Sequence, residues 1–401
     1  MLKNLALSLV SLLLSLYLAD LVLHRYSLGP AYLRSWETGV PYDTRDRLQF
    51  ILDKRAEGQD AFPAPNALLF IKTPVLVRGE RVVPLGGVAN ALAVGGNEGG
   101  FHSAFTTDES GFNNPKGTWP LKSARYIFLV GDSFTYGDCV KQGEDVASHL
   151  RGLVPDVVNL GARGNGPLQE LAAIREYVPA GKVGHVFWMF YERNDLIDLK
   201  DGKGDPILMR YLDAGFSQGL LSRQRDVDAA VRSYLEERIE KERAERPIVF
   251  AALRSKLKEF MPRKAASEAN AGGGAEGGAK PKEGEVDIAL FKEVVARAKR
   301  EVESKGGKFV FVYLPSYRRF SGETLNPWAN HKEAVIRSFQ ELEAPIIDME
   351  PHFLKTGDPL SFFPFRLNGH FNGAGYALVA RVLADFLQGK GVESASPDRP
   401  K

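Results

Sequence analysis

The sequence predicts an α/β fold of three layers, in which a five-stranded parallel sheet lies between two layers of helices. Five short runs of apolar, β-favouring residues alternate with stretches of helical length. This alternation is typical of right-handed β-α-β crossovers, which make a parallel sheet. The predicted strands are Tyr126 to Val130, Val157 to Leu160, His185 to Phe190, Lys308 to Leu314 and Ile346 to Asp348.

Composition and charge narrow the class of protein. The chain has 401 residues, 44% of them hydrophobic, so it can bury a sizeable core. Its formal net charge of +2 gives no indication of a nucleic-acid partner. The single cysteine, Cys139, excludes an internal disulfide framework, and we interpret it as a packing residue rather than a reactive thiol. The histidines show no pairing at ligand spacing, so we expect no metal and no cofactor.

The amino terminus contains an apolar run of about the length that spans a bilayer. Residues 5 to 23 form this run, Lys3 precedes it, and no small-residue cleavage site follows. We therefore expect residues 1–27 to be an uncleaved signal anchor with a single transmembrane helix. With Lys3 on the cytoplasmic side, the rest of the chain would lie in the periplasm or outside the cell.

The segment 28–122 reads as a β-rich extension of the main domain. It is rich in glycine and proline and contains two β-type runs, Ala67 to Thr73 and Val75 to Val83. Within the second run, Arg78-Gly79-Glu80 is typical of a turn. We expect hairpins here that pack on the main domain.

The main domain is expected over residues 123–390, with a helical insertion over 200–285. Two stretches of the insertion have helical spacing, Gln224 to Arg246 and Ile248 to Phe260. The apolar stripe of the first favours packing on the parent domain, with a membrane or partner surface as the alternative. Residues 265–285 read as a flexible linker and 391–401 as a disordered tail.

The candidate nucleophile is Ser133. It follows the first predicted strand in the sequence Gly131-Asp132-Ser133, at the carboxyl end of that strand. Ligands bind at this edge of open α/β sheets. Ordinary turn chemistry explains the same three residues equally well, so the assignment depends on the rest of the chain.

Two later turns offer donors for the oxyanion of an acyl-transfer reaction. Gly164 lies in the glycine-rich stretch after the second strand, and its backbone N–H is one candidate. Asn194 follows the third strand, and its side-chain amide is another. His370 lies in a loop before the last predicted helix and is the natural base.

Together these blocks resemble the SGNH (GDSL-type) hydrolase superfamily, and specifically its membrane-anchored bacterial branch. The resemblance covers about residues 105 to 390, with the blocks in the expected order. It implies that Ser133 is the nucleophile, that His370 is the base, and that the Ser133 amide, the Gly164 amide and Asn194 form the oxyanion hole. The matching blocks are Gly131-Asp132-Ser133, Gly164, Asn194-Asp195, and His370 with Asn372 and Gly375.

The chain departs from this family where the acid of the triad is expected. The family usually places an aspartate two or three residues before its histidine, and this chain has Asn368 and Leu367 there. Asn368 is the orienting candidate, because an amide can orient a neutral imidazole without stabilising its charged form. A backbone carbonyl, recruitment of Asp358, or weak catalysis are the alternatives.

The resemblance and the amino-terminal run predict a membrane-anchored serine esterase that removes acyl groups, in particular acetyl, from an extracytoplasmic glycan or lipid. One alternative is an O-acetyltransferase that passes the acyl group to a polysaccharide beside a membrane acyltransferase partner. Another is a glycan-binding module without catalysis, which the substitution at Asn368 motivates.

Overall fold

The structure is a computed structural model, and it describes residues 2–246, 286–325 and 331–390. Three features expected from the sequence lie outside these ranges. They are the second helical stretch of the insertion, Ile248 to Phe260, the linker 265–285 and the tail 391–401.

The predicted parallel sheet is confirmed, with all five strands at the expected places. Its order is β10-β9-β8-β6-β7, and every neighbouring pair is parallel. Along the chain, β6 is the first strand of this sheet, and it lies between β7 and β8, so the order of the strands reverses beside it. Ligands of open α/β sheets bind at such a reversal. The bounds are β6 (Tyr126–Gly131), β7 (Val157–Asn159), β8 (Val183–Tyr191), β9 (Lys308–Leu314) and β10 (Ile346–Asp348).

Alternate residues of each strand enter two different cores, as the pleat of a strand requires. Phe128 and Trp188 pack among the helices on one face of the sheet. Leu129 and Met189 pack among the helices on the other face. Both faces are therefore buried, which explains why the strands read as nearly continuous apolar runs.

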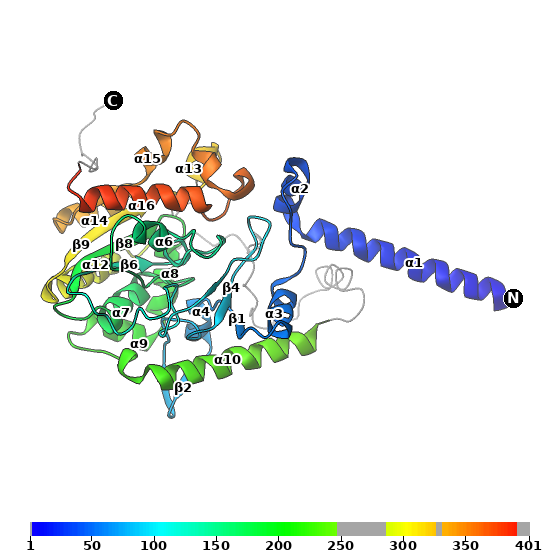
Figure 1. Ribbon diagram of the computed structural model, residues 1–401, viewed down its shortest axis with the longest axis horizontal. Coiled ribbons are helices and arrows are strands. Elements are labelled where there is room, and N and C mark those ends of the chain that lie inside the picture. Colours follow the sequence, from blue (N-terminus) through cyan, green and yellow to red (C-terminus); the bar gives the residue numbers. More distant parts are fainter. Residues whose placement is uncertain (1, 247–285, 326–330, 391–401) are drawn as a thin grey trace.

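Helices form the two outer layers of the sandwich (Figure 1). Core residues of α7 (Pro167–Tyr177), α12 (Ile288–Ser304) and α14 (Lys332–Glu341) cover one face. Those of α6 (Val146–Arg151) and α16 (Gly373–Leu387) cover the other. The shorter helices of this part of the chain are α5 (Ser133–Tyr136), α8 (Asp195–Lys203), α9 (Pro206–Met209), η1 (Arg210–Leu212), η2 (Leu221–Arg223), α13 (Arg318–Ser321), α15 (Glu350–Leu354), η4 (Pro359–Phe362) and η5 (Pro364–Arg366).

The amino-terminal extension contains a small three-stranded sheet, a hairpin and short helices. The sheet has the order β1-β4-β5. The hairpin predicted over residues 75 to 83 is confirmed, and Arg78 and Gly79 at its turn both have positive φ angles, of 51° and 83°. The bounds are α2 (Gly29–Thr38), α3 (Arg47–Ala56), β1 (Ala61–Pro63), α4 (Ala67–Lys72), β2 (Val75–Val77), β3 (Glu80–Val82), β4 (Leu92–Val94) and β5 (Ala104–Thr106).

The prediction of a β-type run over Ala67 to Thr73 is wrong, because helix α4 occupies Ala67–Lys72. The Asn66 side chain caps this helix by accepting a hydrogen bond of 2.9 Å from the Leu68 N–H. Ala67 and Phe70, one helical turn apart, are the buried residues of the helix. The cap and this buried pair outweigh the β propensity of the run.

The first helix of the insertion is confirmed as α10 (Gln224–Glu245). Its buried residues, Val227, Val231, Leu235 and Ile239, form the predicted apolar stripe. The stripe packs toward the extension, where Arg55 forms a two-pronged ion pair with Glu236 across distances of 2.8 Å. The helix therefore covers the extension, as Figure 1 shows along its lower edge.

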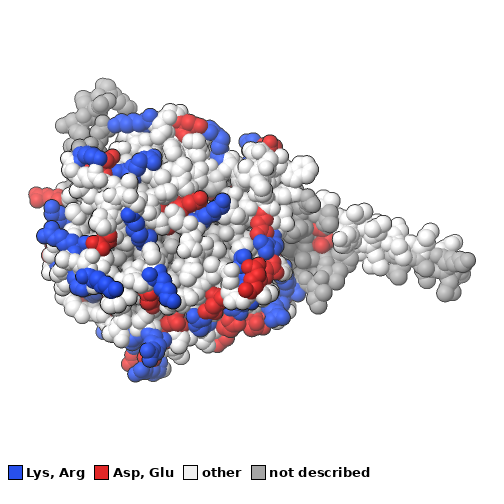
Figure 2. Space-filling model, viewed as in Figure 1, with Lys and Arg blue, Asp and Glu red and all other residues white. Residues whose placement is uncertain are grey.

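Helix α1 (Leu2–Ser27) projects away from the body of the protein (Figure 1). Its described side chains include exposed Leu7, Val10 and Leu14, and Figure 2 shows charged groups of both signs mixed over the body but few along this helix. Within the described ranges, no helix meets both the length and the apolarity needed to cross a bilayer. The anchor and the extracytoplasmic location stay predictions from the sequence.

Candidate active site

Ser133 lies directly after the central strand β6, as the first residue of the short helix α5. Asp132 caps this helix, because its side chain accepts a hydrogen bond of 2.9 Å from the Phe134 N–H. This cap fixes the direction in which the chain leaves the strand. The hydroxyl of Ser133 therefore stands at the carboxyl edge of the sheet, beside the reversal of strand order.

His370 meets Ser133 from the other end of the chain. Its Nε2 atom lies 2.8 Å from Ser133 Oγ, although the two residues are 237 positions apart. Asn372 caps the following helix α16 through a 3.0 Å bond from the Gly375 N–H, and the Phe134 ring packs against the imidazole with 4.7 Å between centroids. The structure thus brings together the predicted nucleophile and the predicted base.

A carboxylate that the sequence analysis did not identify completes the arrangement. Glu98, in the loop between β4 and β5, holds His370 at two atoms. Its Oε1 lies 2.9 Å from His370 Nδ1, and its Oε2 accepts a 2.7 Å bond from the His370 N–H. With the proton on Nδ1, Nε2 is free to accept the hydroxyl proton of Ser133. Ser133, His370 and Glu98 therefore have the connectivity of a catalytic triad.

Glu98, rather than Asn368, is the group beside His370 Nδ1, and the orienting role of Asn368 stays a prediction. The alternative acid, Asp358, instead forms an exposed ion pair with Arg366, at distances of 2.7 and 2.8 Å. Glu98 can reach the imidazole because its loop, between β4 and β5 of the extension, approaches His370 from outside the sheet domain.

The loop that carries Glu98 is held at both ends. Gly95 N–H donates to the Ser103 carbonyl at 2.7 Å, and Ser103 N–H donates to the Gly96 carbonyl at 3.0 Å, which prolongs the β4–β5 ladder toward Glu98. On the histidine side, a Cβ atom added to Gly369 would lie 2.4 Å from Glu98 Oε2. The close approach of Glu98 to the His370 backbone therefore requires glycine at position 369.

The segment after α2 supports the same loop. Asn97 Nδ2 donates to the Asp43 carbonyl at 2.8 Å, and Asp43 N–H donates to the Gly100 carbonyl at 2.7 Å. Asn97 Oδ1 in turn accepts a 2.9 Å bond from the Gly100 N–H. These bonds fix the residues on both sides of Glu98, so the position of the acid depends on the extension as a whole.

The charges around His370 favour its protonated form. Burial lowers the pKa of His370, but the charge and hydrogen bond of Glu98, together with the charges of Asp138 and Asp132, outweigh burial and raise the pKa to about 9. Burial would raise the pKa of Glu98, but the charge of His370 and its hydrogen bonds hold it below its usual range. An imidazolium at His370 is thus strongly stabilised.

Asn194 occupies the expected place after β8, but its amide is already engaged. Asn194 Nδ2 donates to Asp132 Oδ2 at 3.1 Å and to Asp198 Oδ2 at 2.7 Å. Both of its N–H groups are used by these carboxylates, because an amide nitrogen has two. Asn194 therefore links the Asp132 cap to helix α8 in this structure, and its role at an oxyanion stays a prediction.

Gly164 lies in the loop after β7 and has a φ angle of +69°, in the left-handed region that favours glycine. A Cβ atom at this position would lie 2.3 Å from Asn66 Oδ1, so the extension packs directly against the loop. Next to it, the Arg163 carbonyl accepts a 2.7 Å bond from the Ala67 N–H, and Arg163 Nε pairs with Asp138 Oδ2 at 2.5 Å. Its predicted oxyanion role is not tested by these contacts.

Four acidic residues are buried close to one another beneath the serine, namely Asp132, Glu170, Asp195 and Asp198. Burial raises the pKa of each carboxyl, and for Glu170, Asp195 and Asp198 the charges of their neighbours raise it further. Within the described part of the chain, neither carboxyl oxygen of Glu170 has a hydrogen-bond partner. The cluster therefore carries a cost in stability next to the site.

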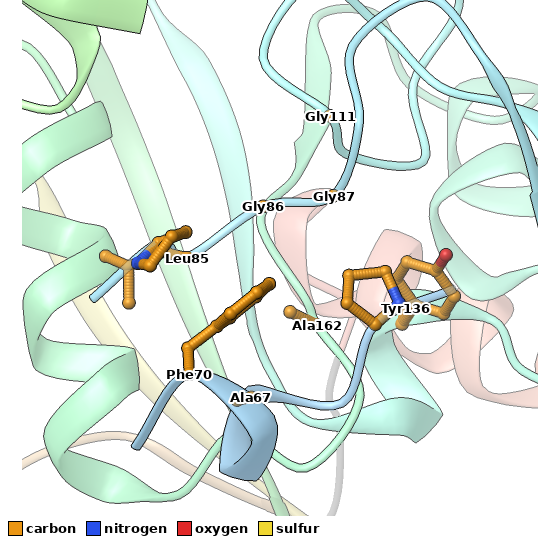
Figure 3. A pocket seen from close by; sticks show the side chains of 10 residues that line it. Ala67, Phe70, Leu85, Gly86, Gly87, Gly111, Tyr136 and Ala162 are labelled. Carbon is orange, nitrogen blue, oxygen red and sulfur yellow. The ribbon is translucent and has the colours of Figure 1, made fainter. Parts of the chain in front are cut away.

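A small apolar cavity lies where the extension meets the sheet domain (Figure 3). Phe70 and Leu85 of the extension line one side, while Tyr136 and Ala162 of the sheet domain lie opposite. Its volume is about 10 Å³, close to the minimum for one water molecule. The cavity is therefore too small to hold an acyl chain.

Glu98 could not be predicted from residues near the histidine, because it lies 272 positions before His370. One signal was available: Asn97 and Glu98 stand between two pairs of glycines, Gly95-Gly96 and Gly99-Gly100. Such a loop allows close approach of backbones, and it presents a single carboxylate. The pattern has no fixed spacing to Ser133 or His370, so only the fold connects them.

Comparisons with known proteins found likeness in fold only. No protein-family model matches the chain, and the search of curated proteins found no relative. Among solved structures, a protein from Bacillus subtilis matches with a TM-score of 0.35 and 15% identity, covering 68% of this chain and 58% of that one. A lipase/acylhydrolase from Enterococcus faecalis matches with a TM-score of 0.36 and 13% identity, covering 69% of this chain and 100% of that one.

A two-domain esterase active on acetylated mannans also matches, with a TM-score of 0.34 and 16% identity, over 69% of this chain and 52% of that one. The chain thus spans little more than half the length of two of these three proteins. Likeness at this level says nothing of the chemistry of this chain.

Proposed function

We propose that this chain is a serine ester hydrolase of SGNH type, with Ser133 as nucleophile, His370 as general base and Glu98 as the acid that orients the base. The observation that carries the proposal is the continuous chain of contacts through His370. It runs from Ser133 Oγ to Nε2 at 2.8 Å and from Nδ1 to Glu98 Oε1 at 2.9 Å.

Acylation begins with neutral His370 carrying its proton on Nδ1. Ser133 Oγ attacks the ester carbonyl, and its proton passes to His370 Nε2 as the new C–O bond forms. Glu98 stabilises the imidazolium that results. When the tetrahedral intermediate collapses, the bond to the leaving alcohol breaks and His370 returns the proton to that alcohol.

Deacylation repeats these steps with water. His370 Nε2 takes a proton from a water molecule, whose oxygen attacks the carbonyl of the acyl-serine. The bond to Ser133 Oγ then breaks, the proton passes to the serine, and the carboxylic acid leaves. Each cycle therefore consumes one ester and one water and restores the enzyme.

The oxyanion of both intermediates needs positioned donors. We assign the Ser133 N–H, because the first turn of a helix leaves its N–H groups without partners inside the helix, and the Gly164 N–H, on the loop that Asn66 supports. Asn194 would join them only by giving up one of its two bonds to carboxylates.

The substrate class follows from the resemblance and the amino-terminal run rather than from a contact in the site. It is an acylated, in particular acetylated, glycan or lipid outside the cytoplasm, reached by an enzyme anchored through residues 1–27. Transfer to a polysaccharide beside a membrane acyltransferase stays an alternative with the same acyl-serine. The glycan-binding alternative without catalysis was based on the absence of an acid near His370 in the sequence. Glu98 removes that basis, because its carboxylate lies beside His370.

The test compares the full-length chain with Ser133→Ala in two assays. A fluorophosphonate should label the wild type covalently and leave the variant unlabelled, and p-nitrophenyl acetate turnover should fall by roughly 10⁴-fold or more in the variant. Equal labelling of folded wild type and variant, or none of either, would refute the assignment of Ser133. A His149→Ala variant, at a histidine outside the site, controls for general effects of substitution.

A further inference from the structure

Beside Glu98 and His370 lies Cys139, a residue that the proposed mechanism does not use. One ligand atom of each residue, a thiol sulfur, a carboxylate oxygen and an imidazole nitrogen, lies within 4.8 Å of the other two. No other such group occurs in the ranges that the structure describes. These are the three ligand types that Zn²⁺ takes in proteins.

The position of Cys139 is fixed by its backbone rather than by chance packing. Its φ angle is +64°, which is uncommon for a residue other than glycine, and its N–H donates a 3.1 Å bond to Asp138 Oδ1. A Cβ atom at Gly96 would lie 3.6 Å from Cys139 Sγ, so the sulfur faces the loop that carries Glu98. This geometry aims the thiol at the carboxylate.

From this geometry we infer that Glu98, Cys139 and His370 form an inhibitory site for Zn²⁺ on the acid side of the triad. A tetrahedral zinc ion needs ligand atoms about 3.5 Å apart, given its bonds of about 2.0 to 2.3 Å. The three atoms approach this spacing through small side-chain movements, and a water molecule completes the four ligands. The side chains of His370 and Glu98 are 19% and 27% exposed, whereas Cys139 is buried.

Zinc at this place would stop the base from working through a change of tautomer. The ion binds Nδ1, where it replaces the hydrogen bond to Glu98, and the imidazole then keeps its proton on Nε2. Nε2 becomes a donor toward Ser133 Oγ and cannot accept the serine proton. Cys139 binds as a thiolate, so its proton is released to solvent. The inhibition by zinc rests on the proposed function, whereas the metal binding itself does not.

Cobalt provides a direct measure of binding, because thiolate ligation gives Co²⁺ a charge-transfer absorption. Cys139 is the only cysteine of the chain, so this band reports on Cys139 alone. We expect the band in the full-length wild type and in Ser133→Ala, and expect Zn²⁺ to remove it by competition. It should be absent from Cys139→Ser, which keeps the size of the side chain.

Turnover of p-nitrophenyl acetate provides the second measure. Zn²⁺ should inhibit the wild type, with recovery on adding a chelator, and Cys139→Ser should keep its metal-free turnover. The variant should lose at least the roughly 10- to 100-fold in zinc affinity that loss of a supporting partner costs. No cobalt band in the folded wild type, or equal zinc inhibition of Cys139→Ser, would overturn the inference.

The two measurements separate this inference from the proposed function. A cobalt band in a chain that shows neither labelling nor turnover would keep the metal site and refute the esterase. Turnover and labelling without a cobalt band would keep the esterase and refute the metal site. If Cys139→Ser does not fold, Glu98→Gln in the same cobalt titration should weaken the band by removing a different ligand.

Discussion

The candidate site has two halves with different origins in the chain. The sheet half consists of Ser133, Asn194 and His370, which follow strands or precede helices of the parallel α/β domain. The extension half consists of Glu98 and Asn66, which come from loops of the amino-terminal segment. In the sheet half, strands and helices position the groups proposed to react. The extension half supports these groups, because Glu98 Oε1 lies 2.9 Å from His370 Nδ1 and Asn66 packs against Gly164.

In this chain the parallel α/β domain thus supplies the proposed nucleophile and base, and the amino-terminal extension supplies the groups that support them. The parallel sheet fixes where a nucleophile and a base must stand. It does not fix from which direction a carboxylate reaches the far nitrogen of the base. Substitutions in the two halves can measure how strongly the sheet half depends on the extension half.

The largest effect should come from removing the acid. Glu98→Gln should lower p-nitrophenyl acetate turnover by roughly 10⁴-fold, because an amide neither stabilises the imidazolium nor holds the tautomer. Glu98→Asp, which keeps the charge, should retain more activity than the amide. Asp358→Asn is the matched control and should keep full turnover, since its carboxylate pairs with Arg366 instead. If Asp358→Asn lost turnover while Glu98→Gln kept it, the acid of the triad would be Asp358 of the sheet domain and not Glu98.

The second prediction concerns pH and uses the same contact. Turnover requires neutral His370, and the pKa of His370 is raised to about 9, so kcat/KM should increase with pH and level off above that value. Below it, the slope should be about tenfold per pH unit. In Glu98→Gln the charge that raises the pKa of His370 is gone while its burial remains, so the curve should shift to lower pH. An unshifted curve would show that Glu98 does not set the charge of His370.

The third prediction concerns the contact between Asn66 and the loop after β7. Gly164→Ala should lower turnover by roughly 10- to 100-fold, because its Cβ would displace Asn66 and move an oxyanion donor. Gly181→Ala is the control, since Gly181 has a similar φ angle of +72° and open space around it. Both variants bear the strain of a left-handed alanine, roughly 1 to 2 kcal/mol. Equal turnover in the two would exclude the role given to the Gly164 loop.

The smallest effect should concern stability and the buried carboxyls beneath the sheet half. Glu170→Gln should raise the free energy of unfolding at neutral pH by about 1 kcal/mol, because a raised carboxyl pKa in the folded state costs stability above about pH 4.3. The stability of the wild type should therefore fall more steeply than that of the variant as pH rises above this value.

Chemical denaturation of the wild type and Glu170→Gln at pH 5 and pH 7 would measure the free energy of unfolding and its dependence on pH. Glu176→Gln, on the same helix, is the opposite control, because the Glu176 carboxylate accepts bonds from Tyr211, Gln218 and Leu220 and its loss should destabilise the protein. A destabilised Glu170→Gln would show that its carboxyl has a partner that holds it charged.

The sheet half could be predicted from the sequence because periodicity and order determine it. The five strand runs, the turn at Ser133 and the loop at His370 are local patterns, and a parallel sheet brings their ends to one edge. The structure confirms the strands, and it places His370 Nε2 at 2.8 Å from Ser133 Oγ. Helix α4 was missed because the apolar run at Ala67 fits a strand equally well until its Asn66 cap is considered.

The extension half could not be predicted because its contacts are not local. Glu98 is 272 positions from His370, and no spacing rule joins a loop of one segment to a loop of another. The contacts of Asn194 were also beyond prediction from the sequence. Its place was predictable, but the two carboxylates that take up its amide became apparent only in the packed structure.

The separation of Glu98 from His370 along the chain also has a consequence for the time at which activity arises during synthesis. The acid is made first, the nucleophile next and the base 237 residues after the nucleophile, so a growing chain carries an unactivated serine while those residues are added. Contacts between such distant residues form late, after the segments between them have folded. Under the proposed function, reactivity would therefore arise in one step, once helix α16 docks and brings His370 to Ser133.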